Sequence, residues 1–332
     1  MTDVARLAGV SHQTVSRVLN NHPHVRPATR DRVLTAIDTL DYRRNSSARA
    51  LVTRRSQTLG IVALDTTLYG PTSTLFGIER AARDAGYFVS IISLRTITRQ
   101  AVHEAVDFLI RQSVDGLVVI APLRSAVEGL ADLPLDVPVV AVEGGSAPDL
   151  PVVCVDQVAG AEAATRHLLD LGHTTVWHVA GPADWLEAEA RVHGWRSTLE
   201  AAGAEIPDPL AGDWSPRSGY EAGRMLVRRS DVSAVFVAND QMALGVLRAL
   251  REAGMDVPAD VSVAGFDDVP EAAYFAPPLT TVRQDFASVG RHSIEVLLDQ
   301  LDGTGGKGRV PPRIVVPAEL VVRSSTMSVG SR

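Results

Sequence analysis

The sequence predicts an α/β protein made of two doubly wound lobes, preceded by a small all-α helix-turn-helix headpiece. Two features of the chain predict this fold. The first 55 residues show helical spacing of apolar residues, whereas from residue 57 onward short β-rich runs alternate with helix-length segments. Such alternation is typical of parallel sheets covered on both faces. A chain of 332 residues is long enough for one small and one large domain.

The most informative element of the headpiece is an amphipathic helix over residues 11–20. Ser11 is a suitable N-cap, and it follows a turn in which Gly9 supplies the bend between two crossed helices. We expect apolar residues with helical spacing to pack this helix against its neighbours. They are Val15, Val18 and Leu19 within it, Val4, Leu7 and Ala8 before it, and Val33, Ala36 and Ile37 after it.

The opposite face of this helix carries side chains that suit DNA. Arg forms two hydrogen bonds with guanine in the major groove and Gln does the same with adenine, so we expect base contacts from His12, Gln13 and Arg17. We expect phosphate contacts from Thr14, Ser16 and Asn20. The alternative is an ordinary solvated helix in a small helical domain.

The distribution of charge favours the DNA interpretation. Residues 1–55 contain ten Arg and four Asp, a net charge of +6, whereas the whole chain carries −7 and the remainder therefore carries −13. A basic head on an acidic body is the electrostatic pattern of a nucleic-acid-binding protein.

A second short helix is expected between the headpiece and the body. Asn45 can cap it, and Ala48 and Leu51 share one face among several arginines. Isolated helices below about 12 residues are marginal in water, so the folding of this segment should be coupled to a partner. A plain linker is the alternative.

The body contains apolar strands separated by helices. The expected strands are Leu59–Leu64, Phe88–Leu94, Leu117–Ile120, Val137–Val142, Val152–Val155, Val176–Ala180, Ala234–Ala238 and Val261–Phe266. The expected helices are Thr74–Ala85, Arg99–Gln112, Ala159–Leu171, Arg191–Ala202, Gly219–Arg229, Gln241–Ala253 and Ala287–Leu301. The body holds about eleven such segments, more than one sheet usually contains, so we expect two lobes.

Polar residues follow several of these strands, at the place where ligands bind in open α/β sheets. They are Glu143, Asp156, Asn239, Asp240, Asp267 and Asp268. Helix capping alone is the alternative for such residues, above all for Asp240 and Asp268.

Other sequence features exclude several classes of protein. No apolar run approaches 18 residues and no secretory signal pattern is present, so we expect a cytoplasmic protein without a membrane segment. Cys154 is the single cysteine and is expected to be a buried strand residue. The Gly-rich segment 303–308 lacks the ending of a phosphate loop, and the nine histidines lack metal-site spacing. We therefore expect no cofactor, no metal and no catalytic residues.

Long stretches of the chain resemble the lactose repressor/galactose repressor (LacI/GalR) family of bacterial regulators. The resemblance begins with residues 3–20, followed by Val25, Thr29, Val33, Ala36 and residues 40–42. It continues through residues 180–182, 212–215, 237–245, 265–268, 277–281 and 284–286, and so covers nearly the whole chain.

The resemblance implies a periplasmic-binding-protein-like core of type I behind the headpiece. The headpiece would span residues 1–44, the hinge helix and linker 45–56, and the core 57–332. Within the core, the first lobe would comprise about 57–155 and 286–313, and the second about 156–284 and 314–332. The chain would cross between the lobes near Val155, Gln284 and Val315.

The resemblance also implies an effector site between the lobes. Its residues would be Leu64, Glu143, Arg191, Trp214, Asn239, Asp267, Gln284 and Phe286. Arg, Asn and Asp offer directed donors and acceptors to vicinal hydroxyls, and an aromatic ring packs on the C–H face of a sugar. Trp214 in the core and Arg191 in a surface ion pair are the structural alternatives.

The expected function is that of a transcriptional regulator, not an enzyme. We expect it to bind palindromic double-stranded operator DNA as a homodimer, with an operator affinity that a bound mono- or disaccharide controls. The hinge helices of two subunits would enter the minor groove, with Leu51 as the wedge. A purine or a phosphorylated metabolite is the alternative effector. A sugar-binding transport protein or a hydrolase with the same core is a more distant alternative.

Overall fold

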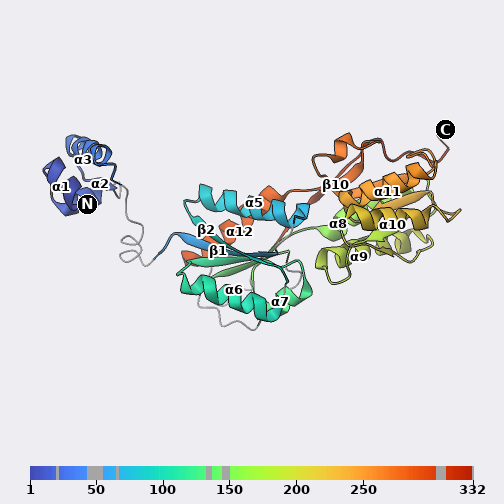
Figure 1. The fold of residues 1–332 in the computed structure, drawn as a ribbon, viewed down its shortest axis with the longest axis horizontal. Coiled ribbons are helices and arrows are strands. Elements are labelled where there is room, and N and C mark those ends of the chain that lie inside the picture. Colours follow the sequence, from blue (N-terminus) through green and yellow to red (C-terminus); the bar gives the residue numbers. More distant parts are fainter. Residues whose placement is uncertain are drawn as a thin grey trace. The chain divides into compact units, whose positions relative to one another are not determined.

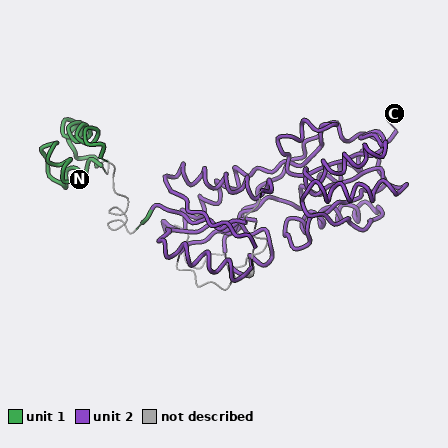
Figure 2. Tube along the Cα trace, in the orientation of Figure 1, with its two compact units in different colours: residues 1–56 green, residues 57–332 purple. Residues whose placement is uncertain are grey.

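The computed structural model describes residues 1–19, 22–42, 55–64, 67–96, 98–131, 137–143, 150–303 and 312–330 (Figure 1). The contacts within the chain divide it into two compact units, residues 1–56 and 57–332 (Figure 2). Each unit is described by itself. Among the described residues, no helix is both long and apolar enough to cross a membrane.

The first unit holds three helices, α1 (Thr2–Ala8), α2 (His12–Leu19) and α3 (Pro27–Thr39). Helix α1 ends at Gly9, whose φ of 63° is a left-handed conformation that glycine adopts without strain. Helix α2 begins after Ser11, whose Oγ accepts a hydrogen bond from the Thr14 N–H at 3.2 Å. The expected cap is therefore present.

The headpiece core is built on apolar residues of all three helices. They include Val4, Ala8, Val15, Val18, Val33 and Ala36. The prediction that Leu7 faces inward is wrong, because its side chain is 55% exposed. The buried face of α1 is formed by Val4, Ala5 and Ala8, and the helical turn of about 100° per residue places Leu7 at the edge of that face.

The first lobe of the second unit is a parallel sheet in the order β11-β5-β4-β3-β1-β2. Its strands are β1 (Thr58–Leu64), β2 (Phe88–Leu94), β3 (Gly116–Ile120), β4 (Val139–Val142), β5 (Val152–Val155) and β11 (Arg313–Val316). Ile61 packs with α5 (Tyr69–Asp84) and α12 (Phe286–Leu301), and Val62 packs with α6 (Arg99–Arg111) on the other face. The short helix α7 (Arg124–Ala131) lies beside α6 (Figure 1).

The second lobe has a sheet in the order β12-β10-β9-β8-β6-β7, and β12 alone in it runs antiparallel to its neighbour. The strands are β6 (Trp177–Ala180), β7 (Leu210–Ala211), β8 (Ala234–Val237), β9 (Ser262–Asp267), β10 (Thr280–Gln284) and β12 (Ala318–Val321). One face packs against α10 (Pro216–Leu226) and α11 (Asp240–Glu252), and the other against α8 (Gln157–Asp170) and α9 (Leu186–Ala202). A 3₁₀ turn, η1 (Ala272–Tyr274), follows β9.

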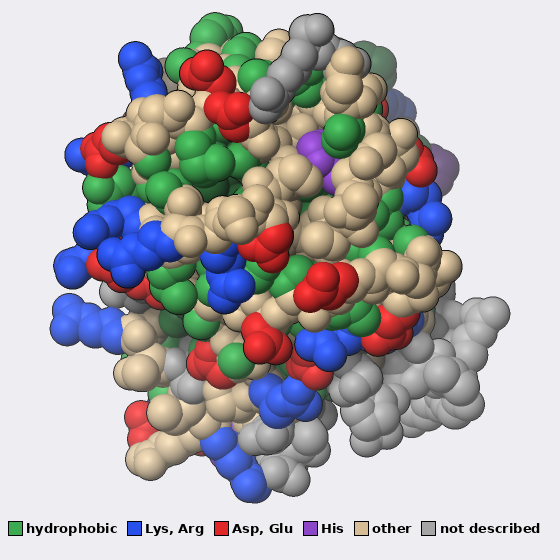
Figure 3. All heavy atoms as spheres, turned by 90° about the vertical axis from the view of Figure 1, so that its right-hand side faces the viewer, with side chains coloured by type: hydrophobic (Ala, Val, Ile, Leu, Met, Phe, Trp, Pro, Cys, Tyr) green, Lys and Arg blue, Asp and Glu red, His purple; other side chains and the backbone are tan. Residues whose placement is uncertain are grey.

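The chain crosses between the lobes after β5, after β10 and between β11 and β12. Residues 314–316, which the sequence analysis assigns to the second lobe, lie in β11 of the first sheet and correct that boundary. On the end face of the second lobe, acidic and basic side chains are interspersed (Figure 3).

Two helices of the first lobe approach each other closely enough to require glycine. A Cβ on Gly77 of α5 would lie 2.4 Å from the Phe286 carbonyl oxygen, and one on Gly290 of α12 would lie 2.2 Å from the Gly77 carbonyl carbon. The contact fixes α5 on α12. It thereby places the first turn of α5, which begins at Tyr69, at the cleft between the lobes.

A buried histidine lies in the middle of the second lobe. The His178 ring stacks between Trp195 and Phe236, with ring centroids 5.2 and 4.8 Å away. Its Nδ1 lies 2.9 Å from the Phe236 carbonyl oxygen. Burial lowers the pKa of His178 from 6.5 to about 4, so the folded protein keeps the ring neutral.

Replacing His178 by Phe should reduce the acid sensitivity of the fold. The unfolded chain takes up a proton near pH 6.5, so this contribution to stability is full above that pH and is lost as the pH falls toward 4. Urea denaturation should show the free energy of unfolding of the wild type falling relative to that of His178→Phe by roughly 2–3 kcal/mol between about pH 7.5 and about pH 4.5. The exposed His193 provides a matched His→Phe control. A difference between wild type and His178→Phe that stays constant with pH would contradict the assignment.

Candidate functional site

Helix α2 presents the polar face that the sequence predicts. His12, Gln13 and Arg17 are exposed, and Thr14 and Ser16 are partly buried. The Thr14 Oγ1 lies 3.0 Å from the Ser11 Oγ, so the two hydroxyls are tied to the helix start. The remaining DNA-contact candidates, Asn20, Asn45, Ala48 and Leu51, lie outside the described residues.

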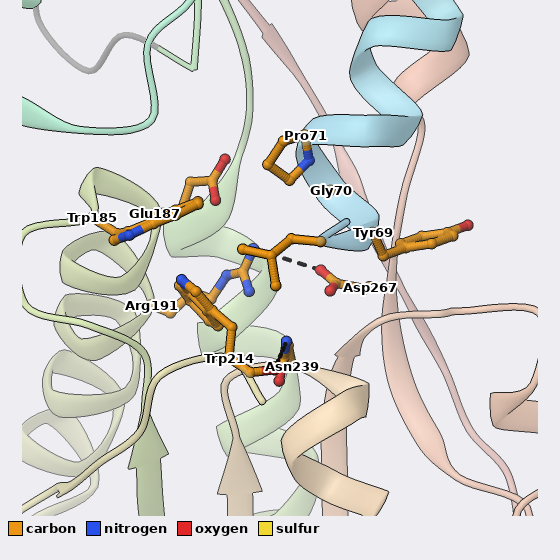
Figure 4. Close-up of a pocket in the computed structure, with 10 residues that line it drawn as sticks. Tyr69, Gly70, Pro71, Trp185, Glu187, Arg191, Trp214, Asn239 and Asp267 are labelled. Carbon is orange, nitrogen blue, oxygen red and sulfur yellow. Dashed lines mark hydrogen bonds and ion pairs between the residues drawn. The ribbon is translucent and has the colours of Figure 1, made fainter. Parts of the chain in front are cut away.

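The second unit has a small pocket between its two lobes, with a cavity volume of about 20 Å³ (Figure 4). The first lobe contributes the start of α5, with Leu68, Tyr69, Gly70 and Pro71. The second lobe contributes Trp185, Glu187, Arg191, Trp214, Asn239 and Asp267. The Tyr69 ring points away from the middle of the pocket and packs edge-on against Phe286, with ring centroids 5.8 Å apart.

Arg191 is the buried charge at the centre of this site. Its side chain projects from α9 with 2% of the residue exposed, and its guanidinium lies 3.9 Å from the centroid of the Phe266 ring. The Nε donates to Gln157 Oε1 at 2.9 Å and Nη1 donates to the Ala238 carbonyl oxygen. Nη2 lies 3.7 Å from Asp267 Oδ1, which is an ion pair but too long for a hydrogen bond.

Two buried amides complete a closed polar ring with Arg191. Gln157 Nε2 donates to Gln284 Oε1 at 2.8 Å, and Gln284 Nε2 donates to Asp267 Oδ1 at 2.7 Å. Burial raises the pKa of Asp267 to about 7, against the opposing effect of Arg191. The ring therefore holds the guanidinium and this carboxyl in fixed places while Asp267 Oδ2 stays available to a ligand.

The aromatic wall is held by Asn239. Its Oδ1 caps α11 by accepting from the Met242 N–H at 2.9 Å, and its Nδ2 donates to the Trp214 carbonyl oxygen at 3.2 Å. The Trp214 ring meets Trp185 edge to face, with centroids 5.6 Å apart. Trp214 Nε1 is buried and has no hydrogen-bond partner among the described residues.

Three residues of the cleft have a left-handed backbone although none is glycine. Their φ angles are 58° at Glu143, 71° at Trp214 and 109° at Asp267. Such conformations cost free energy for residues with a Cβ, and they cluster at binding sites where the surroundings hold them.

The structure brings half of the predicted effector residues to one pocket. Arg191, Trp214, Asn239 and Asp267 line it, and Gln284 lies behind Asp267. Glu143 instead lines a neighbouring cavity.

The two remaining effector residues lie elsewhere. Phe286 lines a groove between α5 and α12, because its ring packs outward against Tyr69. Leu64 is partly buried and packs against the cores of both lobes. Neither residue lines the pocket described above, and their part in effector binding stays a prediction.

Three of the strand-end acids have structural partners. Asp156 caps α8 by accepting from the Ala159 N–H at 2.9 Å. Asp240 accepts from the Thr281 hydroxyl at 2.6 Å, and Asp268 pairs with Arg283 at 2.7 Å and with Arg323 at 2.6 Å. Helix capping therefore describes Asp156, whereas Asp240 is held by a hydroxyl group and Asp268 by two arginines, so the capping alternative is wrong for these two.

Sequence reasoning missed Tyr69, Pro71, Trp185 and Glu187. Two helices begin earlier than predicted, α5 at Tyr69 and α9 at Leu186. The segment Leu186-Glu-Ala-Glu-Ala190 consists of strong helix formers, and that signal places Glu187 one turn before Arg191 on the same face.

Comparisons with known proteins agree with this arrangement. The model of bacterial regulatory proteins, lacI family, matches residues 1–45, and that of a periplasmic binding protein-like domain matches residues 165–326. The lactose operon repressor of Escherichia coli (strain K12) is 34% identical over 335 residues, covering 99% of this chain and 91% of the repressor. The chain belongs to the LacI family. This family member is a DNA-binding transcriptional regulator, as its relatives are, and not an enzyme.

Other relatives of this LacI-family regulator match over most of their length. The regulator CelR of Thermobifida fusca is 36% identical over 336 residues, covering 97% of this chain and 96% of CelR. Among solved structures, a lac repressor dimer bound to operator and an anti-inducer superposes with a TM-score of 0.87 at 33% identity, covering 98% of each chain. A CelR–cellobiose complex superposes with a TM-score of 0.73 at 33% identity, covering 97% of this chain and 98% of that one.

Replacing Arg17 by Ala should relax the base preference at one position of each DNA half-site. Losing a bidentate base contact costs about 1–3 kcal/mol of discrimination. Selection from a randomised pool of palindromic DNA, followed by sequencing, measures the preference. Arg32→Ala, on the exposed side of α3, is the matched control. An unchanged selected sequence for Arg17→Ala would remove this residue from the base-reading set.

Proposed function

We propose that this LacI-family regulator binds a palindromic operator as a homodimer, and that a neutral saccharide held between the two lobes of its core controls the operator affinity. The observation that carries the proposal is the closed ring of Arg191, Gln157, Gln284 and Asp267, which faces the aromatic wall of Trp185 and Trp214.

The open groups of this pocket match a sugar. Arg191 Nη2 can donate a hydrogen bond to a ligand, and the neighbouring Asp267 Oδ2 can accept one. This pair of groups suits two adjacent hydroxyl groups of one sugar ring. The indole faces supply apolar surface for the C–H side of that ring. Relatives named for the lactose and ribose operons, and a relative solved with cellobiose, are consistent with a saccharide.

A phosphorylated effector fits this pocket less well. Two acidic residues, Glu187 and Asp267, line the pocket, but its lining includes a single cationic residue, Arg191. Arg191 already donates hydrogen bonds to Gln157 and to the Ala238 carbonyl oxygen. An anion would lie beside two carboxyl groups with one shared cation to offset them.

We propose that α2 reads the operator with His12, Gln13 and Arg17 in the major groove and with Thr14 and Ser16 near phosphates. A recognition helix that begins with exposed polar side chains has the form this docking requires. For Asn20 and for Asn45, Ala48 and Leu51 of the hinge, the proposal rests on the sequence alone.

The effector changes operator affinity only if it binds two conformations of the core with different affinity. A thousandfold loss of operator affinity requires a preference of roughly 4 kcal/mol. The pocket is suited to this, because its walls come from both lobes and the ligand would therefore favour one arrangement of the lobes.

Thermal melts of the purified protein with hexoses, disaccharides, purines and sugar phosphates should show stabilisation by a neutral sugar. A ligand at about one hundred times its Kd adds roughly 2.7 kcal/mol to the stability of the folded state. The same sugar should release fluorescent operator in an anisotropy titration.

The matched variants for that measurement lie on one helix. Arg191→Met removes the charge at the centre of the pocket and should abolish the sugar-induced stabilisation, whereas Arg196→Met alters an exposed position of α9 and should keep it. Stabilisation by purines or sugar phosphates alone would overturn the saccharide assignment and leave DNA binding untouched.

The proposed dimer would cover apolar side chains that are exposed on the chain. Phe76 of α5 is 66% exposed and Phe88 of β2 is 73% exposed in the first lobe. Met225 of α10 and Leu244 of α11 are exposed in the second. Exposed apolar side chains of this size gain free energy when a second chain removes them from water.

Leu244→Glu should weaken the dimer and lower operator affinity, because a palindromic site is bound by two linked headpieces. Light scattering at micromolar protein is expected to give a dimer for the wild type and a monomer for the variant. Glu substitution of the exposed Leu34 in α3 is the matched control. A monomeric wild type would refute the dimer proposal.

A further inference from the structure

Backbone contacts join the two lobes in addition to the three crossings of the chain. Leu123, which lies between β3 and α7 in the first lobe, forms an isolated antiparallel bridge with Trp185, which precedes α9 in the second. The Leu186 N–H donates a hydrogen bond to the Pro122 carbonyl oxygen at 2.9 Å. We call this contact between residues 122–124 and 184–186 the lobe bridge.

An ion pair lies beside the lobe bridge. Arg124 Nη2 of the first lobe donates to Glu189 Oε2 of the second at 2.6 Å. The Arg124 N–H also approaches the Asp184 carbonyl oxygen at 3.5 Å, which is long for a hydrogen bond. The two charged side chains are more than half exposed, so solvent screens their attraction. The pair thus adds a modest, charge-dependent part to a contact that the backbone otherwise makes.

The lobe bridge completes the start of α9. The first N–H groups of a helix have no partner within it, and Trp185, at the N-cap position, makes no side-chain cap hydrogen bond. The Pro122 carbonyl oxygen of the first lobe takes the place of a cap for the Leu186 N–H. If the lobes move apart, this N–H loses its partner.

The lobe bridge also forms part of the pocket wall. Trp185 lines the pocket, and its ring meets that of Trp214 edge to face (Figure 4). Leu123 packs against the apolar cores of both lobes. A displacement of Trp185 would therefore change the pocket and the lobe bridge together.

In this arrangement of the lobes, the pocket is too small for a sugar ring. Its volume of about 20 Å³ is enough for about one water molecule, whereas ligand pockets commonly measure about 300–1,000 Å³. A sugar ring beside Arg191 and Asp267 therefore requires the lobes to separate, and the first lobe then covers it from a wider position. That separation breaks the lobe bridge.

We propose that the lobe bridge is a latch that holds the ligand-free core closed, with Arg124 and Glu189 as its positioning residues. Binding of an effector must supply the free energy that opens the latch, so a weaker latch gives a higher affinity for the effector. The part of the latch in effector entry rests on the proposed function, whereas the closed ligand-free state does not.

Hydrogen–deuterium exchange of the full-length protein without ligand, resolved to single residues, measures the latch. The Leu186 amide reports on it, because this N–H has no partner inside α9. Arg124→Glu places two carboxylates side by side and should lower the protection of this amide about fivefold, which corresponds to about 1 kcal/mol. Glu189→Arg should do the same. The double variant Arg124→Glu/Glu189→Arg restores opposite charges and should regain most of the protection.

The pair Arg217–Glu221 provides the matched control. It joins two exposed side chains of α10, within the second lobe, at 3.1 Å. Arg217→Glu should leave the exchange of the Leu186 amide unchanged. All of the substituted side chains are more than half exposed, so the variants are expected to fold.

Isothermal titration calorimetry with lactose and with cellobiose tests whether the latch opposes effector entry. A sugar that binds the wild type should bind Arg124→Glu about fivefold more tightly, and the double variant with the affinity of the wild type. Addition of that sugar should also lower the protection of the Leu186 amide in the wild type.

The outcomes separate the latch from the sugar-responsive function. A Leu186 amide that exchanges freely in the wild type, or a double variant no better protected than the single variants, would overturn the latch. A sugar affinity that is unchanged or lower in Arg124→Glu would overturn its part in effector entry. If neither sugar binds any of these proteins, the exchange measurement still decides whether the latch exists, and the result counts against the saccharide assignment alone.

Discussion

The structure depends on keeping one positive charge out of water. Arg191 is almost fully buried between two α/β lobes, and a buried guanidinium is tolerated only where hydrogen bonds and an opposite charge surround it. Its partners lie where the chain passes from lobe to lobe. Gln157 follows the first crossing and Gln284 precedes the second. All of these partners belong to the second lobe, which therefore holds Arg191 in place by itself.

The second lobe supplies nearly all of the polar part of the pocket, and the first lobe mainly covers it. Trp214, Asn239 and Asp267 come from the second lobe, whereas the start of α5 comes from the first. The Gly77–Gly290 contact holds that cover in place. A ligand can thus bind mainly to the second lobe and change the conformation of the core when the first lobe closes over it.

The alternation of apolar strands with helices was sufficient to predict both lobes and most of their strands. It was insufficient at β7, β10, β11 and β12. Thr280–Gln284 has a single apolar residue, Glu319 interrupts β12, and the apolar runs of β7 and β11 are only two and three residues long. For the site, a strand end predicted Asp267 and Asn239, but the same signal selected Asp240 and Asp268, whose partners lie within the second lobe. The sequence locates a residue at the end of a strand. Whether its side chain faces the ligand depends on tertiary contacts, which the sequence pattern does not contain. Glu187 escaped prediction because the start of α9 was placed one turn too late.

The left-handed backbone at Glu143, Trp214 and Asp267 bears on how the protein can change over evolutionary time. Glycine would relieve the backbone at each position, but at Trp214 it would also empty a buried aromatic site, and at Asp267 it would leave Arg191 without its opposite charge. Selection for thermal robustness alone would therefore act against the side chain mainly at Glu143, whose buried carboxyl group has a raised pKa. Engineering of a more stable variant, by consensus substitutions or by screening for melting temperature, would therefore need a second screen for the response to ligand. Without that screen, it would enrich stable regulators that no longer bind their effector.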